Sequence, residues 1–458
     1  RASAEAQGLD ARALRRLRRA TGAEVRELGA LAGVAHVILH GGRCVFAHAE
    51  GWADVERGRR FGLDTLCSLH GCTKPLVVAA FLTLVDEGRV RLSDPVEKYV
   101  PFARVVRSGS RVRRTGSAPT LRHLLAMTGG LGYTGSPGYD GLMKRVQRGR
   151  VADLATFCEG LAELPLVAEP GRRYEYSFST DVLGRVCEVV SGETLEEFVG
   201  RRLLQPLGMS DTHFVVPKRK QQRVAQLYRC EPSSLSKRRL GAQPFAARAY
   251  DDPQSAPGIL SAGGGILSYK DPGMLSTARD YARFCQMLLD GGVGPGRRRV
   301  LSEATVRLLW RDALAPYARA DGRVPGWNEP GPGRRYWDHV GWSLLGAHVT
   351  FSDGPREDGV ARKGSCMFMG GGGGAYWCID ARRRFVALSF SQSFGGGREG
   401  NADGQDGHGP RGNDAAPFAR AAADGSSVLL PHEYGRYGRP GIREEEVAVR
   451  IPLHDWAA

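Results

Sequence analysis

The stretch "LCSLHGCTKPLVVAAFLTLVDEG", residues 66–88, decides the fold of this chain. A polar turn leads into a segment that is apolar nearly all round, which predicts a central buried helix. Pro75 is tolerated because it falls in the first turn, where backbone donors have no intrahelical acceptor anyway. Gly88 is placed to end the helix in a left-handed cap. A catalytic nucleophile three residues ahead of Lys74 would suit this place, but the residue there is Gly71.

Length and composition limit the classes of protein to consider. With 458 residues, 42% of them apolar, the chain can bury a large core as one big domain or as two lobes that share a cleft. No apolar run reaches the roughly 18 residues of a membrane-spanning helix. The nine cysteines are odd in number, scattered and never arranged as C-x-x-C, which argues against a zinc site and a secreted disulfide framework. We therefore expect no metal, no cofactor and a reducing compartment.

The chain is basic, with 64 Lys and Arg against 49 Asp and Glu and a net charge of +15. The arginines gather in short clusters such as "RRLRR" at 15–19 and "RVRR" at 111–114. One interpretation is a solvated surface with no partner. The other is a basic face that contacts an acidic protein, anionic lipid or nucleic acid, although no recognised nucleic-acid motif accompanies the charge.

Local patterns predict a mixed α and β chain. Residues 8–30 have the spacing of an amphipathic helix. The segment "VAHVILHGGRCVFAHAEGWAD", residues 34–54, is typical of a β-hairpin with a two-glycine turn. Residues 120–290 are expected to be mostly helical. A second hairpin is predicted at 375–393, "AYWCIDARRRFVALSFSQS".

The composition changes after the second hairpin. Residues 395–414 read "GGGREGNADGQDGHGPRGND" and contain too few apolar side chains to pack by themselves. The sequence therefore predicts a folded body over residues 1–394 and a polar, glycine-rich extension over residues 395–458. We expect the extension and the basic surface to contact other protein subunits.

Six stretches, taken together and in order, resemble the serine β-lactamase-related family. This family includes class C β-lactamases, penicillin-binding esterases and a mitochondrial β-lactamase-like protein of animals. The six stretches are "GWADVE" (51–56), "TKPLVVAAFLTLVDEGRVRLSDPVEKYVP" (73–101), "LRHLLAMTGGLGY" (121–133), "PGRRYEYSFSTDVLGRVCEVVSG" (170–192), "QPLGMSDTHFVVP" (205–217) and "STARDYARFCQMLLDGG" (276–292). The resemblance implies an α+β fold of the β-lactamase/transpeptidase type: an antiparallel sheet flanked by helices, a mostly helical second lobe, and a cleft between them.

The same resemblance implies three motifs in the cleft, and this chain departs from each. In S-x-x-K the lysine helps to remove the proton of the serine hydroxyl; here the pair is Gly71 and Lys74. In Y-x-N the tyrosine is Tyr176 and the asparagine position holds Phe178. The third motif, K-T-G or H-x-G, falls on Met369, whose thioether carries no charge and donates no hydrogen bond.

These departures predict an inactive chain: a structural or accessory subunit of a larger assembly, inside a mitochondrial matrix or another organelle. The location rests on the unpaired-looking cysteines, the arginine-rich composition and the absence of an initiator methionine. Two alternatives remain. The cleft could bind an ester or peptide ligand without cutting it, or the chain could be a hydrolase with a displaced nucleophile at Ser68, His70 or Cys72.

Overall fold

The computed structural model describes the helices and strands that surround the predicted cleft. The described residues are 11–27, 31–133, 135–229, 273–327, 340–350 and 366–394. The predicted extension, residues 395–458, lies outside them, and so does part of the segment predicted to be mostly helical.

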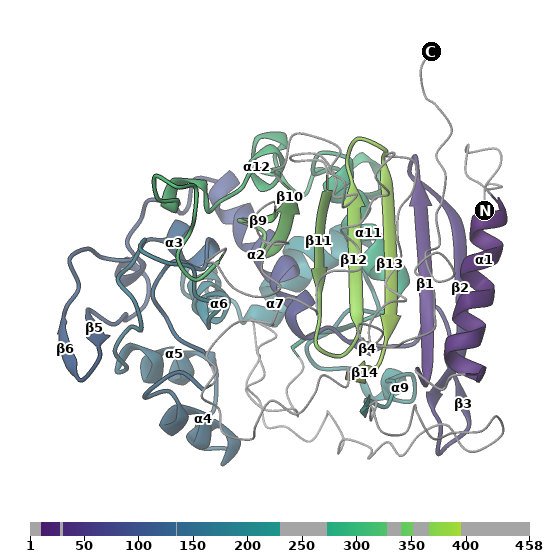
Figure 1. Ribbon diagram of the computed structural model, residues 1–458, viewed down its shortest axis with the longest axis horizontal. Coiled ribbons are helices and arrows are strands. Elements are labelled where there is room, and N and C mark those ends of the chain that lie inside the picture. The colour runs from purple at the N-terminus through teal and green to yellow at the C-terminus, as the bar shows by residue number, and fades with distance from the viewer. Residues whose placement is uncertain are drawn as a thin grey trace.

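An antiparallel sheet of eight strands forms the centre of the molecule (Figure 1). Its order is β3-β2-β1-β13-β12-β11-β10-β9. The strands are β1 (Gly33–His40), β2 (Arg43–Asp54), β3 (Arg59–Arg60), β9 (Val340–Ser343), β10 (Ala347–Thr350), β11 (Cys366–Gly370), β12 (Ala375–Asp380) and β13 (Phe385–Ser391).

Both predicted hairpins are present, and they lie next to each other. Gly41 and Gly42 form the β1–β2 turn with φ angles of 53° and 78°, in the left-handed region that suits glycine. Strands β12 and β13 form the second hairpin, and β13 pairs with β1 so that Val37 lies opposite Leu388. Strands from the two ends of the described chain, β1 and β13, therefore lie next to each other within the sheet.

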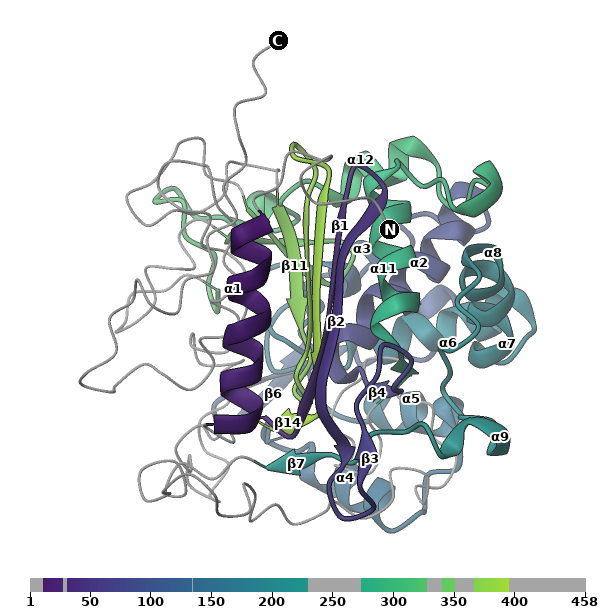
Figure 2. The same cartoon turned by 90° about the vertical axis from the view of Figure 1, so that its right-hand side faces the viewer.

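Helices cover both faces of this sheet, as Figure 2 shows. Helix α1 (Ala11–Gly22), inside the predicted segment 8–30, lies on one face and buries Leu14 and Leu17. Helices α2 (Thr73–Asp86) and α11 (Ala278–Leu289) lie on the other face. This arrangement is the predicted α+β fold with an antiparallel sheet flanked by helices.

The second lobe is mostly helical and lies to the left of the sheet, beyond β9 and β10, in Figure 1. Its helices and those that follow are α3 (Leu121–Leu125), α4 (Asp140–Gln147), α5 (Leu154–Ala162), α6 (Ser179–Ser191), α7 (Leu195–Val199), α8 (Gln205–Leu207), α9 (Lys218–Gln221) and α12 (Glu303–Leu309). Short strand pairs complete the described chain: β4 (Cys67–Ser68) with β8 (Leu275–Ser276), β5 (Val105–Ser108) with β6 (Arg111–Arg114), and β7 (Tyr228–Arg229) with β14 (Ser393–Phe394).

Helix α2 is buried along its length, as its composition predicts. Every residue from Thr73 to Leu84 is buried, and the helix packs against α6 and α7 of the second lobe. Gly88 follows with a φ of 68°, the left-handed conformation expected of a helix cap. In the part of the chain that the structure describes, no helix is long and apolar enough to cross a membrane.

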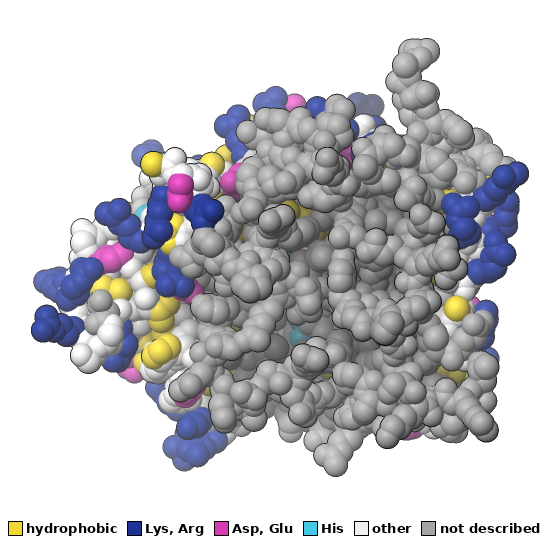
Figure 3. Space-filling model, viewed as in Figure 1, with side chains coloured by type: hydrophobic (Ala, Val, Ile, Leu, Met, Phe, Trp, Pro, Cys, Tyr) yellow, Lys and Arg dark blue, Asp and Glu magenta, His cyan; other side chains and the backbone are white. Residues whose placement is uncertain are grey.

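Basic side chains lie at the two ends of the face in Figure 3, over α1 and over the β5–β6 hairpin. On α1 the arginines Arg15, Arg18 and Arg19 are exposed, while the opposite side of the helix packs on the sheet. The charge clusters seen in the sequence are therefore surface features.

We expect truncation of Phe81 to test the burial of α2. This side chain is fully buried in the middle of the helix, so Phe81→Ala should lower the free energy of unfolding by about 3–5 kcal/mol. Urea denaturation measures the change. Val112→Ala is the control, because Val112 is 49% exposed on β6 and should change stability by less than about 0.5 kcal/mol. Equal effects of the two variants would contradict a buried α2.

Candidate active site

Gly71 lies where the predicted motifs meet. It belongs to a 3₁₀ turn, His70–Cys72, that runs directly into α2. A Cβ atom on residue 71 would lie 3.3 Å from the hydroxyl Oη of Tyr176, 3.2 Å from the carbonyl oxygen of Gly370 and 3.3 Å from Cε of Met369. The structure thus brings three segments, far apart in sequence, around one glycine Cα.

Lys74 is fully buried in the first turn of α2. Its Nζ lies 4.5 Å from the centre of the Tyr176 ring. Burial lowers the pKa of Lys74, while Tyr133, Asp181 and Cys72 act in the opposite direction. Residues three apart on a helix share a face, so the amine lies on the side of α2 where residue 71 lies. A buried amine with a lowered pKa can act as a base.

Tyr176 is held by aromatic neighbours. Its ring packs edge-on against Tyr133 with centres 5.3 Å apart and against Trp342 at 6.3 Å. Burial raises the pKa of Tyr176, so its phenol stays protonated at neutral pH. The hydroxyl can therefore donate a hydrogen bond near residue 71.

Phe178, at the predicted asparagine position, belongs to the same aromatic group. Its buried ring lies 4.8 Å from the ring centre of Tyr133 and 5.3 Å from that of Phe157. The residue thus belongs to the buried core. Met369 behaves differently, because its Cε approaches residue 71 from β11.

The three residues considered as displaced nucleophiles lie around Gly71 with distinct contacts. The thiol of Cys72 donates to the carbonyl oxygen of Ala375 at 3.3 Å, so it points at the sheet. Burial raises the pKa of Cys72, and a protonated thiol is a weak nucleophile. Ser68 has both backbone groups bonded to the Gln392 side chain, at 3.0 and 3.3 Å.

His70, the third of these, has an unusual backbone. Its φ is 45°, in the left-handed region that non-glycine residues seldom adopt. A Cβ on Gly373 would lie 2.9 Å from its Nε2, so the imidazole packs against the β11–β12 turn. Burial, followed by the charge of Lys74, lowers the pKa of His70 to about 4. The ring is therefore neutral at neutral pH.

A short strand fixes the turn that carries Gly71. Strand β8 pairs with β4, immediately before the turn. Just before β8, the carbonyl of Met274 accepts from the amide of Leu69 at 2.8 Å, and the amide of Met274 donates to Oγ1 of Thr73 at 3.0 Å. Residues on both sides of Gly71 are thus tied to one segment.

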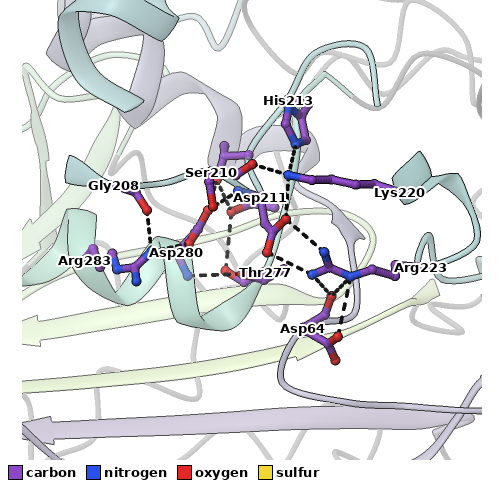
Figure 4. Close-up of polar contacts among 12 residues, drawn as sticks. Asp64, Gly208, Ser210, Asp211, His213, Lys220, Arg223, Thr277, Asp280 and Arg283 are labelled. Atoms are coloured by element: carbon purple, nitrogen blue, oxygen red, sulfur yellow. Dashed lines mark hydrogen bonds and ion pairs between the residues drawn. The ribbon is translucent and has the colours of Figure 1, made fainter. Parts of the chain in front are cut away.

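That segment is in turn held by the polar cluster in Figure 4. Asp211 accepts two hydrogen bonds of 2.9 Å from Arg223 and lies 2.8 Å from the amine of Lys220. The amide of Asp211 donates to Oδ2 of Asp280 at 2.6 Å, and Thr277 caps α11 by accepting from the amide of Asp280.

The link from this cluster to β8 is made by backbone bonds. The amide of His213 donates to the carbonyl of Leu275 at 2.9 Å, and the reverse bond is 2.8 Å. The ion pairs therefore support the turn at Gly71 through β8 rather than by contact with it.

Sequence reasoning missed three residues of this arrangement. Tyr133 and Asp181 both act on the pKa of Lys74, and Gln392 anchors Ser68. A signal existed for Asp181, a lone acidic residue inside the apolar run that follows Tyr176. No local pattern points to Gln392, which lies 324 positions from Ser68.

One family model and several curated proteins match most of this chain. The family model described as Beta-lactamase matches residues 22–407. Esterase EstB of Burkholderia gladioli is 31% identical over 76% of this chain and 83% of its own length. Monacolin J acid methylbutanoyltransferase of Aspergillus terreus is 26% identical over 72% of this chain and 77% of its own length.

Solved structures give the same fold. EstCE1, described as a hydrolase with promiscuous acyltransferase activity, aligns with a TM-score of 0.63 at 22% identity, over 85% of this chain and 96% of its own. The LovD6 mutant of simvastatin synthase from Aspergillus terreus aligns with a TM-score of 0.65 at 24% identity, over 84% and 93% of the two chains.

These matches overturn the prediction of an inactive structural subunit. That prediction assumed that Gly71, Phe178 and Met369 together remove every hydrolytic route. Relatives over most of the chain are named as an esterase and an acyltransferase, so the family is enzymatic. The buried Lys74 and the partly buried Tyr176 also remain beside residue 71. Gly71 excludes a hydroxyl nucleophile at that position. It does not by itself exclude ester hydrolysis or acyl transfer.

We expect the ion pair of Asp211 to stabilise the protein in a pH-dependent way. Its hydrogen bonds from Arg223 lower the pKa of Asp211 from 3.8 to about 2. A carboxyl whose pKa is lower in the folded state stabilises the fold above its unfolded pKa, and this contribution is lost as the pH falls toward 2. Asp211→Asn should therefore cost about 1–3 kcal/mol at neutral pH, and the difference from wild type should shrink toward pH 2.

Urea unfolding at a series of pH values measures this difference. Asp64→Asn is the matched control, because Asp64 contacts the same guanidinium at 3.5 Å but its side chain is 66% exposed. It should change stability by less than about 0.5 kcal/mol. A destabilisation by Asp211→Asn that is constant with pH would contradict the ion-pair explanation.

Proposed function

Because the chain belongs to the Beta-lactamase family, we propose that it is an ester hydrolase that transfers an acyl group to water at the site formed by Gly71, Lys74 and Tyr176. The relationship to esterase EstB, over 83% of that protein's length, is the observation that carries the proposal. The site supports it independently, since it holds a buried amine and a partly buried phenol beside one small residue.

Lys74 is the general base in this proposal. Ester hydrolysis requires the attacking group to lose a proton, and a base does this best when its pKa lies near the working pH. Burial moves the pKa of Lys74 downward from 10.5, in the direction of neutrality. Tyr176 cannot take this role, because its phenol is held protonated by a raised pKa. It instead donates a hydrogen bond to oxygen atoms of the substrate.

The ester that fits the site is uncharged near its acyl group. The three atoms around the Cβ position of residue 71 are a hydroxyl, a carbonyl oxygen and a thioether methyl, and none carries a charge. A carboxylate on the acyl group would lose its hydration without gaining a cation at this point. We therefore assign neutral carboxylic esters to the site in preference to acids that carry a second carboxylate.

A second candidate function is acyl transfer to an alcohol other than water. It is favoured by the relative named as a methylbutanoyltransferase, at 26% identity. The two functions share the acyl donor and differ only in the acceptor. Location inside an organelle, and contact with other subunits, lipid or nucleic acid through the basic surface or residues 395–458, stay predictions.

We expect Lys74 variants to test the proposal. Lys74→Met removes the base, and Lys74→Arg keeps a cation that does not deprotonate in proteins. Both should lower kcat for p-nitrophenyl butyrate by about 100- to 10,000-fold. If Lys74 were only a structural cation, the arginine variant would stay active. In the wild type, activity should fall as the pH decreases through the pKa of Lys74, because protonation removes the base.

Met369 variants test the choice of substrate. Met369→Lys would place an ammonium group near residue 71, where its attraction for a carboxylate at 4 Å is about 1–4 kcal/mol. The ratio of kcat/KM for mono-p-nitrophenyl succinate to that for p-nitrophenyl butyrate should rise by about tenfold or more. Met369→Leu, similar in size and uncharged, should leave the ratio unchanged. A wild type that already prefers the succinate ester would contradict the assignment.

A further inference from the structure

The backbone at residue 71 does not require glycine. Positive φ angles occur at many of the described glycines, but Gly71 is not one of them. A serine or an alanine could therefore adopt the same conformation without strain. The surroundings are tight but adaptable, because the nearest side-chain atoms belong to the flexible Met369 and to the hydroxyl of Tyr176.

The groups around the Cβ position of residue 71 can hold a small hydroxylic molecule. The hydroxyl of Tyr176 can donate and accept a hydrogen bond, and the carbonyl oxygen of Gly370 can accept one. Both lie close to where a side chain would point, at 3.3 and 3.2 Å from the Cβ position. Lys74 lies one helical turn further along α2. A water molecule beside the Cα of residue 71 would have these two oxygen atoms as its hydrogen-bond partners.

We infer that this chain hydrolyses esters by direct attack of water, held beside the Cα of Gly71 by Tyr176 and Gly370, without forming an acyl-enzyme. This inference rests on the proposed ester hydrolase function and adds the identity of the nucleophile. The three residues considered as displaced nucleophiles, Ser68, His70 and Cys72, are each engaged elsewhere. The Cys72 thiol faces the sheet, the His70 ring packs on Gly373, and the backbone of Ser68 is bonded at both its amide and its carbonyl to Gln392.

The reaction balances with the ester and water alone. The water oxygen forms a bond to the acyl carbon while one of its protons passes to the neutral amine of Lys74. The tetrahedral intermediate places negative charge on the former carbonyl oxygen, near the N-terminal end of α2, whose dipole is positive there. The bond between the acyl carbon and the alcohol oxygen then breaks. The departing oxygen takes the proton from Lys74 and restores the amine.

Two variants at residue 71 differ by one hydroxyl and test the inference. Gly71→Ala adds a Cβ that occupies the space beside Cα, so kcat for p-nitrophenyl butyrate should fall by about 100-fold or more. Gly71→Ser adds the same Cβ together with a nucleophile next to Lys74. It should release one nitrophenol per chain in a rapid burst and carry a butyryl group on Ser at position 71. Melting temperatures near that of the wild type show that both variants fold.

Mass spectrometry of acid-quenched protein during turnover separates the outcomes. Wild-type chains that turn over the ester without a butyryl adduct, together with an adduct in the serine variant, support direct attack by water. A butyryl group on Ser68, His70, Cys72 or any other wild-type residue overturns the inference but leaves the ester hydrolase function intact. A folded serine variant that gains no adduct overturns it as well, because residue 71 would then lie away from the acyl carbon.

Failure of the proposed function gives a different result. Wild-type protein that hydrolyses the ester no faster than the Lys74→Met variant would overturn both the function and the inference. In that case Gly71→Ala would also show no loss. The comparison of three proteins in one assay therefore identifies which statement is wrong.

Discussion

Burial of helix α2 on every side is the constraint on which the candidate site depends. The helix is apolar nearly all round, so it is stable only when the sheet and the second lobe both cover it. Lys74 lies in its first turn and is carried into the interior with the apolar residues that follow. An ammonium group in such surroundings loses hydration, which lowers its pKa. The same packing that stabilises the fold therefore lowers the pKa of this amine.

Sequence patterns predicted the parts of this structure that are local. The two-glycine turn, the second hairpin and the buried helix each depend on residues within one short segment, and each is present. The family resemblance also placed Gly71, Tyr176 and Met369, which the structure brings together. Contacts such as Gln392 with Ser68 have no local signal, because their spacing is set by how β13 and β4 pack.

The prediction of inactivity was wrong for a physical reason as well as a comparative one. It treated Phe178 and Met369 as lost catalytic groups equivalent to Gly71. Phe178 instead packs against Tyr133 and Phe157, and Tyr133 in turn packs against the ring of Tyr176. Of these two residues only Met369 approaches residue 71, and Lys74 and Tyr176 keep their places beside it. Side-chain identity alone could not distinguish these two situations.

The ordinary backbone at Gly71 has an evolutionary consequence. Two glycine codons differ from two serine codons by a single base, and Gly71 has no positive φ angle that would require glycine. In the water-attack mechanism that we infer, one point mutation exchanges a free nucleophile for one that is covalently attached to the chain. A Cβ at residue 71 would lie 3.2 Å from the carbonyl oxygen of Gly370, so the neighbouring atoms must shift by a few tenths of an ångström to admit serine, while the helix, the lysine and the sheet stay the same.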